Sequence, residues 1–325
     1  MIIVRADSGA CYRLGSALIA PKELSMSETL HADTDRLLTI GDAIRYAMTR
    51  FEQEGIFYGH GCADSYEEAY FLVLRALKLQ FEDLERFFNA RLTRSEMTRV
   101  LELIEKRAVD KIPTPYLLNE AWLLEHDFYC DERVLIPRSY IAELLDTGLT
   151  PWVEDPEMVG SVLDLCTGSG CLGILAQEAF PNALVEISDI SEDALDVAAI
   201  NLERYGLTED IEAVQSDLFD NLQGRRYDVI ISNPPYVTQE AMDNLTDEYR
   251  HEPALALGSG EDGLDLVRRM LREAPEHLND GGILVVEVGD GREACEAAFP
   301  DLPFTWLATQ EEEDMVFMLR KEDLL

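Results

Sequence analysis

The sequence predicts an α/β protein, in which a small helical domain and a β-hairpin linker precede a doubly wound, mainly parallel sheet with one antiparallel strand. Two observations lead to this prediction. From about residue 140 onward, short apolar runs alternate with helical stretches, which is the pattern of parallel strands joined by helices. Before residue 111, apolar residues instead recur at helical spacing.

The expected helical domain carries two capping signals and an apolar stripe. Ser65 with Glu68, and Thr93 with Glu96, have the spacing of a capping box, in which two side chains bind free backbone groups at a helix start. The residues after Thr93 place apolar side chains on one helical face, namely Met97, Val100, Leu101, Ile104 and Ala108. The first 25 residues show no such period, and we expect them to form a flexible tail.

Two prolines mark the end of the helical domain. Pro113 and Pro115 break the helix, because proline lacks a backbone N–H and restricts the residue before it. Aromatic residues in short β-like runs follow, and they predict a hairpin linker. The expected parts of the chain are a flexible tail, a helical domain, the linker and the sheet domain, at residues 1–25, 26–111, 112–139 and 140–325.

The sheet domain has a series of candidate strands, each a short apolar run bounded by turn residues. Only a short segment separates the last two, so we expect a hairpin that places an antiparallel strand in the sheet. The candidate strands lie at 162–166, 184–188, 211–215, 229–232, 283–288, 304–309 and 315–320.

The charge of the chain is its most unusual compositional feature. It has 64 acidic and 27 basic residues, which gives a formal net charge of −37. Such a field repels nucleic acid and attracts a basic protein. Solvation of the protein in a salty cytoplasm would explain the same composition, and both explanations stay open.

Composition also bears on compartment and metal content. No apolar run approaches the ~20 residues that a membrane-spanning helix needs, and charged residues interrupt the N-terminus before a secretory signal could form. The six cysteines form no Cys-x-x-Cys pair and have no metal-ligand spacing with the five histidines. We therefore expect a cytoplasmic protein that binds neither membrane nor metal.

A glycine-rich loop follows the first strand of the sheet domain. Gly168, Gly170 and Gly173 match the G-x-G-x-x-G pattern, which permits a tight turn and close approach of a ligand. The pattern fits NAD as well as S-adenosylmethionine, and a loop that serves packing alone is the remaining alternative. The loop residues expected to bind the cofactor are Asp164, Thr167, Gly168, Ser169 and Gly170.

Acidic residues follow the next two strands. Asp189 ends the second strand, where a carboxylate can accept hydrogen bonds from both ribose hydroxyls. Helix capping near Ser191 is its alternative role. Asp217, Leu218 and Phe219 come after the third strand, where an adenine ring would lie, although core packing would explain the two apolar residues almost as well.

The tetrapeptide Asn233-Pro234-Pro235-Tyr236 follows the fourth strand and is a more specific signal than the glycine loop. An amide nitrogen is a poor nucleophile, because its lone pair is delocalised into the carbonyl. The Asn233 side-chain oxygen and the Pro234 carbonyl can hold both hydrogens of an amide, while Tyr236 stacks on its plane. We predict that these four residues are catalytic and act by positioning an amide rather than by general base catalysis.

With these motifs the chain resembles the HemK group of protein glutamine N5-methyltransferases. Within that group it is similar to the branch that modifies a ribosomal protein. Members that modify release factors follow the Ile-Pro-Arg segment with Pro-Glu-Thr, whereas this chain has Ser139-Tyr140-Ile141. Besides the tetrapeptide and the glycine loop, the segments that carry the resemblance are 57–61, 119–122, 129–139, 249–255 and 303–307.

The resemblance implies a Rossmann-like, seven-stranded methyltransferase domain, S-adenosylmethionine as cofactor and a helical domain that recognises the substrate. It implies that the substrate is a glutamine of the large-subunit ribosomal protein numbered three, which is basic. It also implies that Arg138, Asn233, Pro234 and Tyr236 bind the substrate, and that Asn233 contacts the cofactor as well.

Several alternatives remain at this stage. The glutamine of a peptide-chain release factor is the nearest one. A nucleic-acid adenine N6-methyltransferase uses the same tetrapeptide, but the acidic charge disfavours it. An NAD-dependent oxidoreductase would leave the tetrapeptide unexplained. A non-catalytic scaffold that binds ribosomal precursors through its acidic surface is the last.

Overall fold

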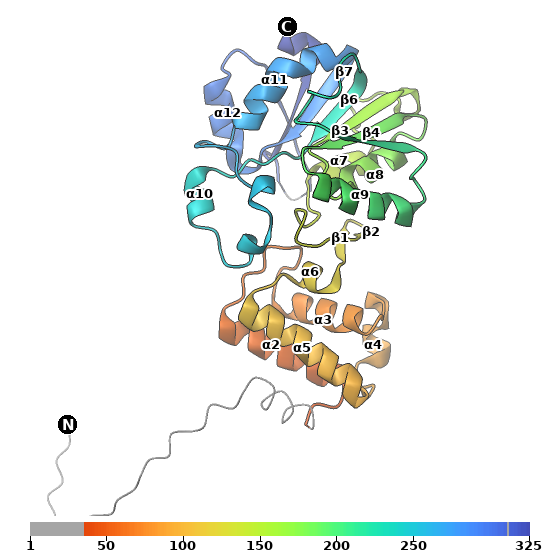
Figure 1. Ribbon diagram of the computed structural model, residues 1–325, viewed down its shortest axis with the longest axis vertical. Helices are drawn as coiled ribbons and strands as arrows, with labels where there is room; N and C mark the ends of the chain where they lie inside the picture. The colour runs from red at the N-terminus through yellow and green to blue at the C-terminus, as the bar shows by residue number, and fades with distance from the viewer. Residues whose placement is uncertain (1–35, 311) are drawn as a thin grey trace, which may run out of the picture.

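The computed structural model describes residues 36–310 and 312–325. The tail expected at 1–25 lies outside this part of the chain. A bundle of helices occupies one end of the molecule and an α/β sandwich the other (Figure 1). A narrow region that includes a two-stranded hairpin joins them.

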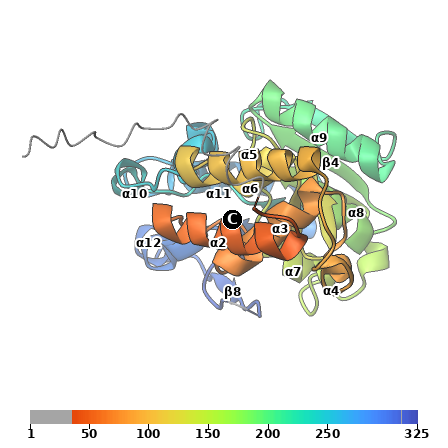
Figure 2. The same cartoon turned by 90° about the horizontal axis from the view of Figure 1, so that it is seen from below.

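The helical bundle is built on α2, α3 and α5, which pack around one apolar core. Figure 2 views the molecule from this end and shows α2 and α5 lying across the α/β sandwich. The capping box predicted at Thr93 is present at the start of α5. Helices of this region are α2 (Ile40–Glu54), α3 (Ser65–Ala76), η1 (Phe81–Asp83), α4 (Leu84–Phe87), α5 (Arg94–Asp110) and α6 (Thr114–Leu118).

The capping box predicted at Ser65 is wrong by one residue. Asp64 caps α3, and its carboxylate accepts hydrogen bonds from the N–H groups of Tyr66 and Glu67. Ser65 and Glu68 lie inside the helix instead, and Glu68 forms an ion pair of 2.5 Å with Arg107 of α5. Glu68 therefore joins α3 to α5 and does not cap the start of α3.

The linker contains a short helix as well as the predicted hairpin. Pro113 and Pro115 end α5 as expected, but they also begin α6, because proline is tolerated in the first turn of a helix. The hairpin strands β1 (Ala121–Leu123) and β2 (His126–Phe128) pair antiparallel. Glu120 fastens the hairpin to the bundle by accepting hydrogen bonds from Arg75 and Trp122.

Within the described residues, the main sheet has seven strands in the order β5-β4-β3-β6-β7-β9-β8. The first five are parallel, and β9 is antiparallel to both of its neighbours, as predicted. The order reverses between β3 and β6, and a crevice forms at such a switch point beyond the carboxyl ends of the strands. The strands are β3 (Ser161–Leu165), β4 (Leu184–Asp189), β5 (Ile211–Gln215), β6 (Tyr227–Ser232), β7 (Leu278–Glu287), β8 (Thr305–Leu307) and β9 (Val316–Arg320).

Helices cover both faces of this sheet and bury a separate apolar core on each. One face is covered by α7 (Ile141–Asp146), α8 (Cys171–Ala179) and α9 (Glu192–Tyr205). The other is covered by α11 (Asp265–His277) and α12 (Arg292–Ala298). The shorter helices are η2 (Pro156–Met158), α10 (Gln239–Asp243), η3 (Tyr249–His251), η4 (Ala254–Ala256), η5 (Gly289–Gly291) and η6 (Lys321–Leu324).

The segment between β6 and α11 runs back toward the helical bundle (Figure 1). It contains α10, η3 and η4. The hydroxyl of Tyr249 donates to the Gly59 carbonyl, and the backbone N–H of Phe57 donates to the Glu248 carboxylate. The bundle is therefore connected to the sheet domain through this segment as well as through the linker. Among the described residues, no helix is long and apolar enough to cross a bilayer.

Candidate active site

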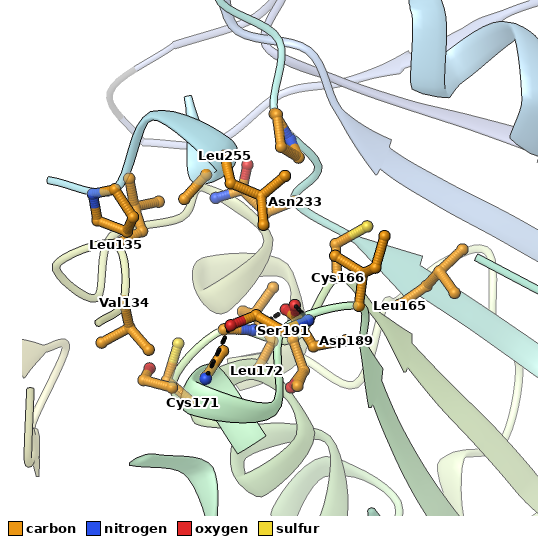
Figure 3. Close-up of a pocket in the computed structure, with 18 of the residues that line it drawn as sticks. Val134, Leu135, Leu165, Cys166, Cys171, Leu172, Asp189, Ser191, Asn233 and Leu255 are labelled. Atoms are coloured by element: carbon orange, nitrogen blue, oxygen red, sulfur yellow. Dashed lines mark hydrogen bonds between the residues drawn. The ribbon is translucent and has the colours of Figure 1, made fainter. Parts of the chain in front are cut away.

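A large cavity lies at the carboxyl ends of β3, β4, β5 and β6. Its empty volume is about 1060 Å³, including the part open to solvent. The loops that follow these strands line it, together with parts of the linker and of the segment before α11. In Figure 3, Asn233 and Leu255 lie across this cavity from Asp189 and Ser191.

The glycine loop forms one wall of the cavity. Thr167, Gly168 and Ser169 line it, as predicted for residues near a cofactor. Gly170 lies behind them in a left-handed conformation, with φ of 80°. A Cβ atom there would come within 3.1 Å of the Ala198 Cβ on α9. Glycine is therefore needed at this position for helix packing as well as for the turn.

Asp164 does not reach the cavity, although it was expected to bind the cofactor. Its side chain is fully buried beneath the loop, where Oδ2 accepts hydrogen bonds from the Thr167 hydroxyl and, at 2.9 Å, from the Gly173 N–H. Burial raises the pKa of Asp164 to about 7, against the opposing effect of these two hydrogen bonds. Asp164 thus shapes the glycine loop rather than lining the site.

Asp189 lines the cavity and also joins two of its loops. One carboxylate oxygen accepts the Gly168 N–H and the other accepts the Ser191 N–H, each at 2.9 Å (Figure 3). Burial raises the pKa of Asp189, and the hydrogen bonds from Ser191 and Gly168 oppose this. The N-cap of α9 is Ser191 itself, whose hydroxyl accepts the Ala194 N–H. Each Asp189 oxygen keeps a lone pair with which it can accept from a bound hydroxyl.

The loop after β5 presents two of its three predicted residues to the cavity. Asp217 lines it and forms an ion pair of 2.7 Å with Arg269. Leu218 lines it too, in a left-handed conformation with φ of 50°. Phe219 does not line the cavity, contrary to the prediction. Its ring is buried in the core and stacks on His277 at a centroid distance of 4.5 Å.

The tetrapeptide stands between this cavity and a second one of about 550 Å³ empty volume. Pro235 faces the first cavity, Pro234 and Tyr236 face the second, and Asn233 lines both. The Asn233 Nδ2 donates a hydrogen bond of 3.1 Å to the Arg138 carbonyl. Since Nδ2 is held in this way, Oδ1 is the side-chain atom of Asn233 that remains to accept hydrogen from a ligand.

Tyr236 is held by a buried glutamate that the sequence analysis missed. Its hydroxyl donates to Oε1 of Glu287 at 3.2 Å, at the carboxyl end of β7. The other oxygen of Glu287 accepts from the Ser139 hydroxyl at 2.6 Å and from the Tyr140 N–H at 2.9 Å. Burial raises the pKa of Glu287, and these hydrogen bonds oppose the rise. Its position at a strand end, like that of Asp189, was the available signal.

Arg138 lines both cavities, but its charge is already paired. Its guanidinium forms two hydrogen bonds with Glu252, of 2.6 and 2.8 Å, and lies over the Tyr249 ring at 5.4 Å. Burial alone would raise the pKa of Glu252, but the paired Arg138 guanidinium, with the His60 ring nearby, lowers it to about 2. The Arg138 guanidinium is therefore not a free charge that a substrate could pair with.

Metal-binding clusters are absent from the described residues, since no group of three or more His, Cys, Asp or Glu side chains could hold a metal ion there. Neither cavity is lined by histidine or lysine among these residues. The loops that follow the strands present backbone N–H groups and carboxylates to the first cavity. Next to the tetrapeptide the site offers acceptor oxygens.

Comparison with known proteins agrees with this geometry. Residues 142–297 match the model of the family described as methyltransferase small domain. A ribosomal protein uL3 glutamine methyltransferase from Neisseria gonorrhoeae is 50% identical over 289 residues, which cover 89% of this chain and 96% of that protein. The protein of the same description from Bordetella pertussis is 51% identical over 288 residues, covering 89% and 97%.

Solved structures resemble the chain more distantly. A methyltransferase from Pyrococcus furiosus is 17% identical, with a TM-score of 0.45, and covers 69% of this chain and 98% of its own. The relatives from Neisseria and Bordetella extend over nearly their whole length. The chain therefore belongs to the family of ribosomal protein uL3 glutamine methyltransferases.

Proposed function

We propose that this protein transfers a methyl group from S-adenosylmethionine to the side-chain amide nitrogen of a glutamine in ribosomal protein uL3. As a member of its family it is an S-adenosylmethionine-dependent methyltransferase. The observation that carries the proposal is the position of Asn233, which lines both cavities and holds its amide nitrogen on the Arg138 carbonyl. Its oxygen is thereby available to a substrate amide.

The first cavity suits S-adenosylmethionine in size and chemistry. Asp189 supplies carboxylate oxygens for the ribose hydroxyls, and the N–H groups at the start of α8 favour the negative carboxylate of the methionine part. Leu218 offers an apolar surface for the adenine, next to the acceptor oxygen of Asp217. When bound, S-adenosylmethionine supplies an electrophilic methyl group on a sulfonium ion.

The tetrapeptide would position the nucleophile. The Asn233 Oδ1 and the Pro234 carbonyl accept the two hydrogens of the glutamine amide, so that its nitrogen lone pair points toward the first cavity. Tyr236 offers an aromatic face in the second cavity, where the glutamine side chain would enter. Catalysis then depends on a near-attack geometry, which can supply several kcal/mol. No strong base is required, because a methylated amide in its cationic form loses a proton readily.

A basic substrate is consistent with the charge of the chain. The formal net charge of −37 favours association with a protein rich in lysine and arginine. Salt screens such attraction over a Debye length of about 8 Å at physiological ionic strength. We expect the KM for uL3 to rise with salt, and free uL3 to be preferred over assembled ribosomes, where RNA covers its basic surface. We propose that the enzyme itself binds no nucleic acid.

The test uses the purified enzyme, methyl-labelled S-adenosylmethionine and either free uL3 or a release factor as substrate. Tandem mass spectrometry locates the label. The proposal predicts label on a glutamine side chain of uL3, and faster labelling of uL3 than of the release factor. Faster labelling of the release factor would overturn the substrate assignment. The absence of label from glutamine in either protein would overturn the reaction.

A further inference from the structure

Two buried glutamates on the segment between α10 and α11 bind different parts of the molecule. Glu248 is 3% exposed, accepts the Phe57 N–H at 3.0 Å and forms an ion pair of 3.5 Å with Arg107. Both of these partners belong to the helical bundle. Glu252, 4% exposed, pairs instead with Arg138 at the active site. These residues lie four positions apart and differ mainly in which part of the molecule they hold.

Glu252 holds the backbone that orients Asn233. It accepts hydrogen bonds from the Ile136 N–H at 3.0 Å and from the two terminal guanidinium nitrogens of Arg138. A two-point pair of this kind fixes geometry as well as charge, and burial of the Glu252 side chain protects it from water. Residues 136–138 are thus fixed at two points, and the Arg138 carbonyl accepts the Asn233 Nδ2.

The helical bundle also contacts Glu252, through His60. The His60 Nε2 lies 3.7 Å from a Glu252 oxygen, and the His60 side chain is 5% exposed. The His60 ring also contacts Tyr249 at a centroid distance of 4.6 Å, and the Arg138 guanidinium lies 5.4 Å from the centroid of the same ring. The loop between α2 and α3 therefore supports the Glu252–Arg138 pair from outside the sheet domain.

We propose that Glu252 is a positioning residue: through Arg138 it fixes the amide of Asn233 with the oxygen toward the substrate. The helical bundle then contributes to the rate of methyl transfer as well as to the stability of the protein, because His60 packs against Glu252. This inference rests on the proposed function. It concerns the catalytic orientation of Asn233 and adds no group that touches the substrate.

The test compares Glu252→Gln with Glu248→Gln, a matched change of a buried glutamate in the same segment. Glu252→Gln should lower kcat about 10²-fold, as a misplaced catalytic group does, and should leave the Kd for S-adenosylmethionine by calorimetry within threefold. Glu248→Gln should lower the melting temperature but keep kcat within threefold. Glu252→Asp retains the charge with a shorter reach, and we expect its kcat to lie between those of Glu252→Gln and Glu248→Gln. If Glu252→Gln folds poorly, Glu252→Asp takes its place and its kcat should be lower than that of Glu248→Gln.

A double variant separates positioning from general damage. If Glu252 acts through Asn233, then adding Glu252→Gln to Asn233→Ala should change kcat by less than threefold, because effects that share one path do not add. A further loss near 10²-fold would contradict the inference. Equal kcat values for Glu252→Gln and Glu248→Gln would contradict it too.

A readout without methyl transfer keeps the inference distinct from the proposed function. The side-chain amide signal of Asn233 in a nitrogen–proton NMR spectrum is assigned by its absence from Asn233→Ala. It should shift in Glu252→Gln and stay in place in Glu248→Gln. An unmoved signal would overturn the positioning role. Failure of the wild-type enzyme to label uL3 would overturn only the proposed function.

Discussion

The two sides of Asn233 are built in different ways. On the cofactor side, Asp189 binds the backbone of residues 21 and 2 positions away in sequence. On the tetrapeptide side, buried glutamates bind partners much farther along the chain. The Arg138–Glu252 pair spans 114 positions, and the Ser139–Glu287 hydrogen bond spans 148. One side is a series of local loops, and the other is assembled from distant segments.

This difference predicts how each side responds to mutation. The cofactor side depends largely on backbone N–H groups, so few of its side chains should be indispensable. The tetrapeptide side depends on two buried carboxylates, Glu252, which is ion-paired with Arg138, and Glu287, which is held by hydrogen bonds. Removing one partner of a buried ion pair strands a charge and costs about 3–5 kcal/mol. We therefore expect mutations on the tetrapeptide side to affect rate and stability, and those on the cofactor side to affect mainly affinity.

The largest expected effect is that of Asn233→Ala. Loss of a preorganised acceptor should lower kcat on the order of 10²–10³-fold, while S-adenosylmethionine binding is weakened but not lost. Single-turnover rates and calorimetry measure the two quantities. Asn182→Ala, an exposed site before β4, is the control. A rate within tenfold of wild type would rule out the acceptor role.

Asp189→Ala should have the next largest effect, on affinity rather than rate. Hydrogen bonds to a charged group contribute roughly 1.5–3 kcal/mol, so the Kd for S-adenosylmethionine should rise about 10- to 100-fold. Calorimetry provides the measurement, with Asp193→Ala on the exposed side of α9 as control. Unchanged affinity would mean that Asp189 serves only to join the two loops.

Tyr236→Phe should have a smaller effect on the tetrapeptide side. It keeps the aromatic face but removes the hydrogen bond to Glu287. At 3.2 Å this bond is long for an O–H donor, so we take the lower range of about 0.5–1.5 kcal/mol. We expect kcat to fall roughly two- to tenfold with little change in cofactor affinity. If cofactor affinity fell more than kcat, the assignment of Tyr236 to the substrate cavity would be wrong.

Asp164→Asn should have the smallest effect on activity, and its effect on stability should depend on pH. The pKa of Asp164 is about 7 in the folded protein, above its ordinary value of 3.8. Between these two pH values the folded state holds a proton that the unfolded state releases, so this group makes stability fall as pH rises. The melting temperature of wild type, relative to Asp164→Asn, should therefore decline from pH 4 to pH 7 and then level off.

Asp146→Asn, an exposed change, corrects this comparison for the lost charge. Cofactor affinity tests the position of Asp164 separately. It should stay within threefold of wild type, because the Asp164 side chain lies beneath the glycine loop. A tenfold loss would place Asp164 on the cofactor side after all.

The local side of the site was the one that the sequence could predict. Gly168, Asp189 and Asn233 each lie at or just after the end of a strand. Parallel strands end at the same edge of a sheet, so these residues meet in one cavity. The alternation of strands and helices likewise predicted the sheet and its antiparallel strand. These features depend on order along the chain, which a sequence displays directly.

The remaining features depend on contacts that no local pattern encodes. Glu248, Glu252 and Glu287 acquire their roles from partners more than 100 positions away. A sequence also does not show which of two adjacent apolar residues lines a cavity. Leu218, which has a left-handed backbone, lines the cavity as well as the core, whereas Phe219 is buried in the core and does not line the cavity. Composition indicated neither the long-range contacts of the glutamates nor the different positions of Leu218 and Phe219.

The central claim is that this protein methylates a glutamine of uL3, with Asn233 as the acceptor that positions it. The most direct measurement is tandem mass spectrometry of uL3 from cells that lack the gene, complemented with wild type or with Asn233→Ala. We predict one glutamine that gains a methyl group on its amide with wild type and stays unmodified with the variant. Unchanged methylation of uL3 in cells that lack the gene, or full methylation with Asn233→Ala, would contradict the account.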